Sequence, residues 1–318
     1  MQDAKRFDIV ALGEAMVEFN QTRTGEPQYL QGFGGDTSNM AIAAARLGAR
    51  TAYVTRVGQD EFGRMLLELW RREGVDTQSI ALDRDAHTAV YFVNHGASGH
   101  VFSYLRAGSA ASRMRVCDLP LELIRSSAFL QASGISLGIS ASAADCVLAA
   151  FEDARAHGVR VALDSNLRLK LWPLARARAV IGAAVAMADY FFPSVEDAQA
   201  LTGLDDHDAI IDWAHGLGAR AVLLKLGEKG VRVSDGRKRD TIEGFKVASV
   251  DATGAGDCFC GAVLARLVAG DTLWEAARYA NAAAALSTTG FGAVAPLPTP
   301  AAVLAMLAGK LIESAMPG

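Results

Sequence analysis

The chain has 318 residues, of which 51% are hydrophobic and 21% charged, and its formal net charge is −4. This is enough apolar material for one large core, and no basic excess points to a nucleic acid or a membrane surface as partner. The N-terminal stretch lacks the apolar core of a signal peptide. No segment approaches the roughly 20 apolar residues of a membrane span. We therefore expect a soluble, cytoplasmic protein.

Short β-rich runs alternate with Ala- and Leu-rich helical stretches along the chain. This alternation predicts a parallel sheet that is covered by helices on both faces. In such folds ligands bind at the carboxyl ends of the strands. The expected strands are 7–12, 52–57, 128–132, 160–164, 190–192 and 221–225, and the expected helices are 38–47, 63–73, 141–157, 195–201, 209–217 and 257–269.

Two segments depart from this alternation. Residues 16–33 contain a turn, Thr-Gly-Glu-Pro, between β-like runs, and residues 87–106 alternate on both sides of His-Gly-Ala-Ser-Gly-His. The second pattern predicts a hairpin. Together the segments are expected to form a small sheet, either a lid over a pocket or an ordinary edge structure. We expect one domain, 1–318, with lid segments at approximately 16–33 and 87–106.

Several familiar nucleotide and catalytic motifs are missing. The first expected strand ends at Leu12 without the G-x-G-x-x-G of a dinucleotide site, and the sequence contains no Walker A loop. H-E-x-x-H and G-x-S-x-G are also absent. A nicotinamide-dependent dehydrogenase is therefore disfavoured, and any phosphate must be held in another way.

The most informative segment is Asp-Ala-Thr-Gly-Ala-Gly-Asp at 251–257. The small residues Gly254, Ala255 and Gly256 let the backbone approach a ligand, and an apolar run that reads as a buried helix follows them. The N–H groups and dipole at a helix start attract anions such as a γ-phosphoryl group. Asp257 in the first turn should be kept ionised by the dipole and could accept a proton from an attacking hydroxyl. The alternative is that it only caps the helix.

A second Gly-rich segment, Gly-Gly-Asp-Thr-Ser-Asn at 34–39, runs into an Ala-rich helix. Gly34 and Gly35 allow a tight turn and close approach of a substrate. Ser38 or Asn39 could cap the helix, and capping does not exclude binding.

A third turn follows the expected strand that ends at Lys225. Gly227 and Gly230 bracket it, which suits contact with a nucleotide but is also common in hairpins.

Two arginines are further candidates. Arg106 ends the second lid segment, and Arg168 follows the strand 160–164. Arginine suits bidentate recognition of a carboxylate or phosphate, although either residue could simply lie on the surface.

The two Gly-rich motifs, in this order and about 220 residues apart, resemble the signatures of the ribokinase/PfkB family of carbohydrate kinases. The resemblance implies a ribokinase-like three-layer α/β/α fold with a central, mostly parallel sheet and a small β-sheet lid. It also implies ATP as phosphoryl donor with Mg²⁺. Whether a monovalent cation is a further cofactor stays open. It makes Asp257 the catalytic base and places Gly254, Ala255 and Gly256 at the anion hole. On the nucleotide side it places Asn166, Arg168, Lys225, Gly227, Gly230 and Asn281.

Members of this family often carry Asn-x-x-Glu near the metal. The matching stretch here is Ser194-Val195-Glu196-Asp197, so Ser and Asp replace Asn and Glu. The outer metal role of this stretch is therefore in doubt, and the metal ligands stay unassigned.

Within the family, the sequence is most similar to 2-keto-3-deoxygluconate kinases, through GEAMVEF, YLRAGSAAS, DSNLRLKLW and GAVAPLP. Two arginines are suitable partners for the carboxylate of such a sugar acid. Some relatives carry an acidic residue near the position of Ala293, which this chain lacks. The substrate-binding residues expected are Gly34, Gly35, Ser38, Tyr91, Tyr104, Arg106, Ile135, Arg168 and Asp257.

Other interpretations stay open at this point. A ribokinase, fructokinase or nucleoside kinase would act on a neutral sugar, which does not need the two arginines. A protein of another class, a non-catalytic sensor of a sugar or nucleotide, could use the same fold. The lid sheet could also pair with a copy of itself, so we expect a homodimer or higher oligomer.

Overall fold

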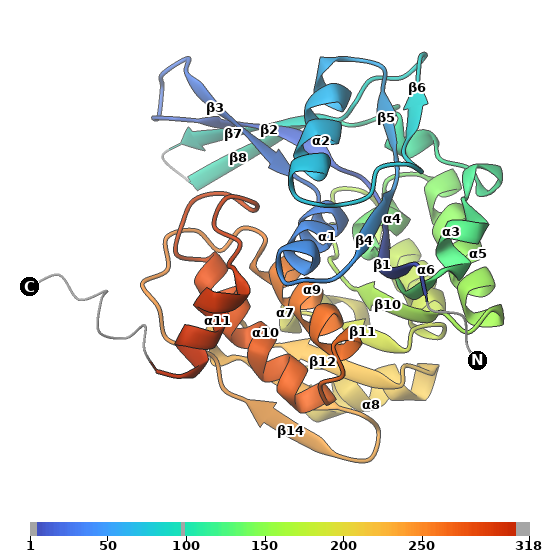
Figure 1. Ribbon diagram of the computed structural model, residues 1–318, viewed down its shortest axis with the longest axis vertical. Helices are drawn as coiled ribbons and strands as arrows, with labels where there is room; N and C mark the ends of the chain where they lie inside the picture. The colour runs from blue at the N-terminus through green and yellow to red at the C-terminus, as the bar shows by residue number, and fades with distance from the viewer. Residues whose placement is uncertain (1–4, 97–98, 310–318) are drawn as a thin grey trace, which may run out of the picture.

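The computed structural model describes residues 5–309 except 97–98. An eight-stranded sheet forms its centre (Figure 1). Neighbouring strands from β12 through β4 are parallel, whereas β13 and β14 join antiparallel at one edge. In spatial order the strands are β14 (Arg239–Ile242), β13 (Val231–Ser234), β12 (Ala221–Lys225), β11 (Tyr190–Phe192), β10 (Arg160–Asp164), β9 (Ser127–Ser133), β1 (Phe7–Leu12) and β4 (Thr51–Val54).

Helices cover both faces of this sheet, and the alternation of side chains along β1 shows why. Ile9 and Ala11 belong to one hydrophobic core, and Val10 and Leu12 belong to another, because successive residues of a strand point to opposite faces. The first core includes α1 (Asp36–Arg46), α2 (Glu61–Arg72), α9 (Ala255–Val268), α10 (Leu273–Ser287) and α11 (Pro300–Leu307). The second includes α3 (Leu121–Arg125), α4 (Gly134–Gly138), α5 (Ala141–Ala156), α6 (Leu174–Val185), α7 (Val195–Thr202) and α8 (His207–Leu217).

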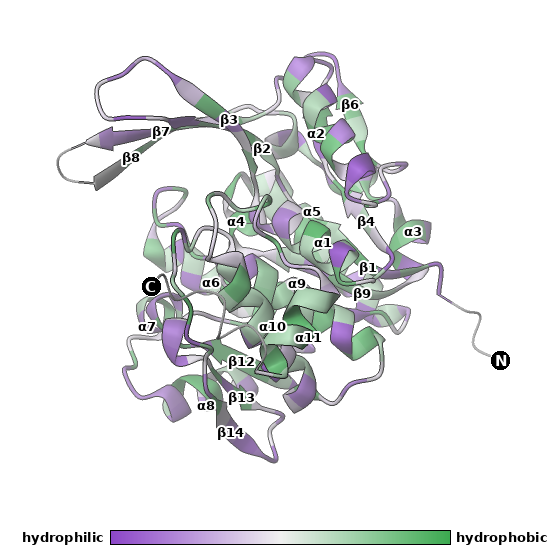
Figure 2. Ribbon diagram, turned by 60° about the vertical axis from the view of Figure 1, so that its left-hand side comes forward, coloured by the Kyte–Doolittle hydropathy of each residue, from purple (hydrophilic) through white to green (hydrophobic). Residues whose placement is uncertain are grey.

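This arrangement is the expected three-layer α/β/α fold with a mostly parallel sheet. The predicted strands 7–12, 160–164, 190–192 and 221–225 match β1, β10, β11 and β12 residue for residue. Helix α9 has mainly apolar residues, as Figure 2 shows by colour, and most of them are buried. The prediction of a buried helix after the glycine motif is therefore confirmed.

The expected strand 52–57 is wrong in one respect, because it is two strands. Strand β4 ends at Val54, and β5 (Arg56–Gly58) leaves the main sheet to pair with β6 (Ala81–Asp83). The guanidinium of Arg56 is held by Asp83 at 2.8 Å and by Asp118 at 2.9 Å. These ion pairs connect distant segments, so a local hydrophobic run could not indicate the break.

The lid is a separate four-stranded sheet that projects from the main body (Figure 1). Its order is β3 (Tyr29–Gly34), β2 (Met16–Gln21), β7 (Val90–Gly96) and β8 (Gly99–Leu105). The two predicted lid segments supply these strands, and the tip of the second hairpin, 97–98, lies outside the described residues. Strands β3 and β8 are the edges, and exposed Leu30 and Leu105 lie on them. Self-association through this sheet stays a prediction.

Three short 3₁₀ helices complete the described elements: η1 (Ala111–Arg113), η2 (Val116–Asp118) and η3 (Gly227–Lys229). Within residues 5–309, less the two that are not described, no helix has the length and apolar character needed to cross a membrane.

Candidate active site

The glycine motif at 254–256 forms the start of α9. Gly254 is the N-cap residue with φ +77°, a left-handed conformation that favours glycine, and no side chain caps the helix. A Cβ at this position would lie 2.8 Å from Cβ of Ala293, so the loop also has no room for a side chain. The first N–H groups of the helix lack partners within it, which makes this end suitable for an anion.

Asp257 lies in the first turn of α9 and does not cap it. Its Oδ2 accepts a hydrogen bond of 2.8 Å from Nδ2 of Asn39 on α1. The two glycine motifs, at opposite ends of the sequence, therefore meet at this carboxylate. The alternative that Asp257 is merely a cap is not realised.

The charge state of Asp257 differs from our expectation. Burial raises the pKa of its carboxyl to about 7, and Asp36 and Asp164 add to the increase, while Asn39 and Lys225 oppose it. Desolvation and neighbouring carboxylates thus outweigh the helix dipole that we expected to keep the group ionised. A pKa near the working pH is what an efficient general base requires.

Asp36, within the first glycine motif, is a site residue that sequence reasoning missed. It is buried, its Oδ2 accepts from Nδ2 of Asn166 at 2.8 Å, and its Oδ1 accepts from the backbone N–H of Thr37. Burial raises the pKa of Asp36, and the nearby Arg168 opposes that increase. Its position in the motif was the available signal, but a carboxylate at a helix start reads first as a favourable dipole contact.

A buried ion pair lies on the other side of Asp257. Both carboxylate oxygens of Asp164 accept from Nζ of Lys225 at 2.8 Å. Burial lowers the pKa of Lys225, but the charge of Asp164 outweighs this effect and the net change is upward. The predicted nucleotide-side residue Lys225 is therefore positively charged and adjoins the start of α9.

The lid contributes a tyrosine pair above this region. The rings of Tyr91 and Tyr104 stack with centroids 5.7 Å apart, and the hydroxyl of Tyr91 donates to the buried carboxylate of Glu18. The hydroxyl of Tyr91 lies close to Gly34. A Cβ on residue 34 would be only 2.5 Å from this hydroxyl, so the position has no room for a side chain. The negative charge of Asp257 contributes to an increase in the pKa of Tyr91, behind burial and Glu18.

Arg106 is not available in the way we expected. Its Nε donates to Oε2 of Glu14 at 3.0 Å, its Nη2 also contacts this oxygen, and Ser109 donates to Oε1 at 3.1 Å. Glu14 has no exposed surface on its side chain, and that of Arg106 is only 13% exposed. The guanidinium charge is thus balanced by a buried carboxylate inside the protein. The prediction that Arg106 binds the carboxylate of a sugar acid would need an unpaired positive charge, and the charge of Arg106 is already paired with Glu14.

The other predicted substrate residues have different surroundings. Ser38 is buried, and its hydroxyl accepts a hydrogen bond of 2.8 Å from Nε1 of Trp70, so its hydroxyl is used in the core. Gly35 precedes α1 as its N-cap, which excludes Ser38 and Asn39 as caps. Ile135 is half-buried on the short helix α4, directly after β9. Arg168 is exposed, and its Nη1 donates to the carbonyl of Leu167.

The third glycine turn is a hairpin connection between the antiparallel strands β12 and β13. Gly227 and Gly230 bracket the turn, which agrees with the alternative interpretation as a hairpin. A role of this turn toward a nucleotide stays a prediction.

Asn281 on α10 donates from Nδ2 to the carbonyls of Ile242 at 3.0 Å and Glu243 at 3.1 Å. This amide therefore fixes the segment that follows β14.

Asp197, which replaces the Glu of the family pattern near the metal, is used within the protein. Oδ2 of Asp197 accepts from the hydroxyl of Ser165 at 2.7 Å and from the N–H of Leu167 at 3.0 Å. The carboxylate is therefore used to hold the loop after β10. In the described part of the chain, no group of three or more His, Cys, Asp or Glu residues is placed to hold a metal ion by itself.

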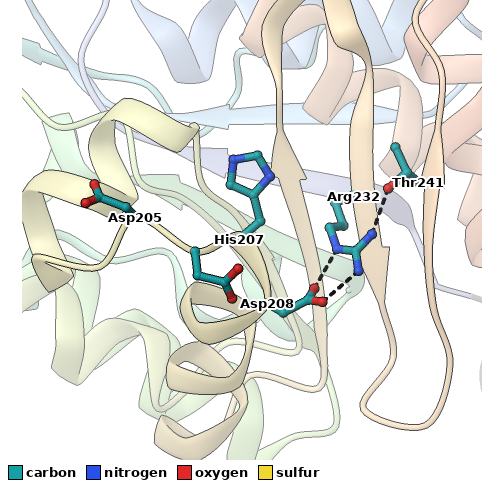
Figure 3. A pocket seen from close by; sticks show the side chains of 6 residues that line it. Asp205, His207, Asp208, Arg232 and Thr241 are labelled. Atoms are coloured by element: carbon teal, nitrogen blue, oxygen red, sulfur yellow. Dashed lines mark hydrogen bonds and ion pairs between the residues drawn. The ribbon is translucent and has the colours of Figure 1, made fainter.

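A surface hollow lined by Asp205 to Asp208, Arg232 and Thr241 has a volume of about 390 Å³ (Figure 3). The guanidinium of Arg232 is held by Asp208 at 2.6 Å and by Thr241 at 2.8 Å. The hollow is lined by the start of α8 and by β13 and β14, and none of the predicted site residues lines it.

Comparison with known proteins defines the class. Residues 6–300 match the model of the pfkB family carbohydrate kinases. The chain belongs to this family and is an ATP-dependent sugar kinase. It is 37% identical to fructokinase-2 of Solanum habrochaites over 318 residues, which is 95% of this chain and 96% of that protein.

Solved structures of sugar kinases are also similar to this chain. The fructokinase of Vibrio cholerae O395, solved with fructose, ADP and a calcium ion, is 32% identical over 95% of this chain and 99% of that one, with a TM-score of 0.85. A double mutant of that enzyme was solved with a potassium ion. A putative ribokinase II of E. coli, in complex with ATP and Mg²⁺, has a TM-score of 0.88 over 95% and 99% of the two chains. At 23% identity it supports the fold alone.

Proposed function

We propose that this chain transfers the γ-phosphoryl group of ATP to the terminal hydroxyl of a free ketose, with fructose as the preferred substrate. The observation that carries this proposal is the pairing of Arg106 with the buried Glu14. A neutral sugar needs no free cation at this point, whereas a sugar acid does. The identity with plant and bacterial fructokinases supports the same choice.

In the proposed mechanism the sugar hydroxyl donates its proton to Asp257 as its oxygen attacks the γ-phosphorus. The N–H groups at 254–256 and the ammonium of Lys225 stabilise the charge that develops on the phosphoryl oxygens. Mg²⁺ bound to the ATP phosphates would neutralise part of their charge. The lid tyrosines Tyr91 and Tyr104 cover the sugar and exclude water, which limits hydrolysis of ATP.

A sugar acid, 2-keto-3-deoxygluconate, is the second candidate. Arg168 favours it, because this arginine is exposed and its positive charge opposes the rise that burial causes in the pKa of Asp36. Fructose and 2-keto-3-deoxygluconate are both six-carbon 2-keto compounds with a terminal hydroxyl. They differ at carbon 3, where the acid lacks a hydroxyl, and at carbon 1, where a carboxylate would require such a cation.

An ADP-release assay with fructose, 2-keto-3-deoxygluconate, ribose and adenosine tests the proposal. We expect the highest kcat/KM for fructose, and the variant Arg168→Gln should leave the KM for fructose unchanged. The exposed Lys170→Gln serves as the matched control for the loss of a positive charge. Preference for the sugar acid, with a KM that rises in Arg168→Gln but not in Lys170→Gln, would establish the second candidate instead.

The same assay distinguishes a kinase from a non-catalytic sensor. Asp257→Asn should lower kcat by about 10²–10⁴-fold, the range for loss of a general base. Activity that survives this substitution would show that Asp257 is not the base. A chain that binds sugar or nucleotide but releases no ADP with any substrate would be a sensor.

A further inference from the structure

Asp164, at the carboxyl end of β10, contacts groups from β12, from α9 and from the loop that follows β10. Besides the two hydrogen bonds from Lys225 of β12, it accepts from Sγ of Cys260 on α9 at 3.2 Å and from the backbone N–H of Asn166 at 3.2 Å. The residue is only 3% exposed. A buried carboxylate is stable when its oxygens are satisfied in this way, so Asp164 is a fixed point from which other groups can be positioned.

Lys225 is the group that Asp164 positions. Its ammonium lies 3.4 Å from the point where a Cβ of Gly256 would be, so it contacts the start of α9. Its side chain is 16% exposed, and burial opposes its charge. A lysine side chain has four flexible bonds and shifts its pKa readily when it is buried. Without Asp164 the ammonium would have neither a fixed place nor a fully charged partner.

We infer that Asp164 is a positioning residue that holds the ammonium of Lys225 against the start of α9, so that both charges of this ion pair are fixed close to the proposed base, Asp257. The inference rests on the proposed role of Asp257 as the base. It assigns a function in the reaction to the buried pair of Asp164 and Lys225. This pair contacts the start of α9 but does not itself accept the proton of the sugar hydroxyl.

The charges around Asp257 determine the direction of the effect. Its carboxyl interacts electrostatically with Asp36 of α1, Asp164 of β10 and Tyr91 of the lid strand β7, and with Lys225 of β12 and Cys260 of its own helix. The carboxylates raise the pKa of Asp257 and the ammonium lowers it. Asn39 of α1 also lowers it, through its hydrogen bond. Asp164 and Lys225 therefore act on the base with opposite signs.

These opposite signs give the inference a specific signature. Asp164→Asn removes a negative charge, so the acid limb of the kcat/KM profile should move to lower pH. Lys225→Met removes a positive charge, so the limb should move to higher pH. Each shift should be roughly one pH unit, the lower end of the range for a charge at close distance. Damage to the fold would lower the rate without moving the limb in opposite directions.

The experiment measures kcat/KM for the sugar from about pH 5 to about pH 9, a range that brackets a pKa near neutrality, at saturating Mg²⁺-ATP. Asp164→Glu and Lys225→Arg are the matched controls, because they keep the charges and should keep the limb in place. The double variant Asp164→Asn/Lys225→Met should return the limb toward the wild-type position, since the two charges are removed together. Thermal unfolding of each variant identifies any that does not fold, and the remaining variants still test the sign.

The outcomes separate the inference from the proposed function. Opposite shifts with unmoved controls support it. Limbs that stay in place, or that move in the same direction, overturn it, provided that Asp257→Asn lowers kcat by the expected factor of about 10²–10⁴. If Asp257→Asn keeps nearly full turnover, the proposed base is wrong, and this failure is distinct from a failure of the ion pair.

Discussion

Asn39 donates a hydrogen bond of 2.8 Å to Oδ2 of Asp257, although the two residues are 218 positions apart in the chain. Asn39 belongs to the first glycine motif, on α1, and Asp257 to the second, on α9. The bond stabilises the ionised carboxylate, against the burial that raises its pKa. Packing of α1 beside α9 therefore connects the N-terminal half of the chain to the proton acceptor.

Replacing Asn39 by alanine should raise the pKa of Asp257 further, because it removes the donor that favours the charged form. The acid limb of the kcat/KM profile should move to higher pH, with a smaller change in the plateau rate at high pH. Oδ1 of Asn39 has no partner among the described residues, so few other bonds are lost. A limb that stays in place would show that this bond does not influence the base.

The base should reduce the stability of the folded protein at neutral and alkaline pH. Its carboxyl has a pKa of about 7 in the folded state, above the ordinary value of about 3.9 for an aspartate. A raised pKa stabilises the folded state fully below the unfolded pKa, and this contribution is lost as the pH rises through the folded value. Above about pH 7 the protein must keep a charged carboxylate in a partly buried site.

Asp257→Asn carries no such charge at any pH. Its Tm should exceed that of the wild type at about pH 8, and the difference should shrink at about pH 5, where the native carboxyl is protonated. Thermal unfolding at the two pH values measures this. A Tm difference that is larger at the lower pH would contradict the sign of the shift.

Ser38→Ala should affect stability and leave substrate binding unchanged. The hydroxyl of Ser38 accepts from Nε1 of Trp70, and Trp70 is fully buried, so its indole N–H would lose its partner. The cost should be about 1–3 kcal/mol of unfolding free energy. Denaturant unfolding measures this value, and steady-state kinetics should give an unchanged KM for the sugar. An increase in KM at unchanged stability would restore Ser38 as a substrate contact.

Gly34→Ala should displace the hydroxyl of Tyr91, since a Cβ would lie 2.5 Å from it. The lid would close less well over the sugar, so the KM for the sugar should rise while the KM for ATP changes little. Gly216→Ala on α8 is the matched control, because nothing lies within 4 Å of a Cβ there. Equal effects from the two variants would refute a specific role for the glycine at 34.

Local pattern predicted much of the architecture. Strands β1, β10, β11 and β12 have the bounds that their hydrophobic runs indicated, since buried parallel strands are continuous apolar segments. The lid segments and the helix after the second glycine motif were also predicted. Helix α6 (Leu174–Val185) was missed, as was the break between β4 and β5, where the ion pairs of Arg56 take the chain out of the main sheet.

The site was predicted in its motifs and less well in its charges. Gly254, Ala255, Gly256 and Asp257 could be chosen from the sequence, because small residues before an apolar helix have a local physical meaning. Neither the pairing of Arg106 with Glu14 nor that of Lys225 with Asp164 could be read in this way, because each joins segments that are distant in the chain.

The sequence by itself determined the alternation of strands and helices and the two glycine turns, since propensity, periodicity and backbone freedom depend on neighbouring residues. The two motifs, in their order along the chain, indicated the family by resemblance. Only the tertiary structure decided which charges are balanced and which way the pKa of Asp257 moves. Those properties depend on distance and solvent exposure, and the fold sets both by bringing α1, β10, β12 and the lid around one carboxylate.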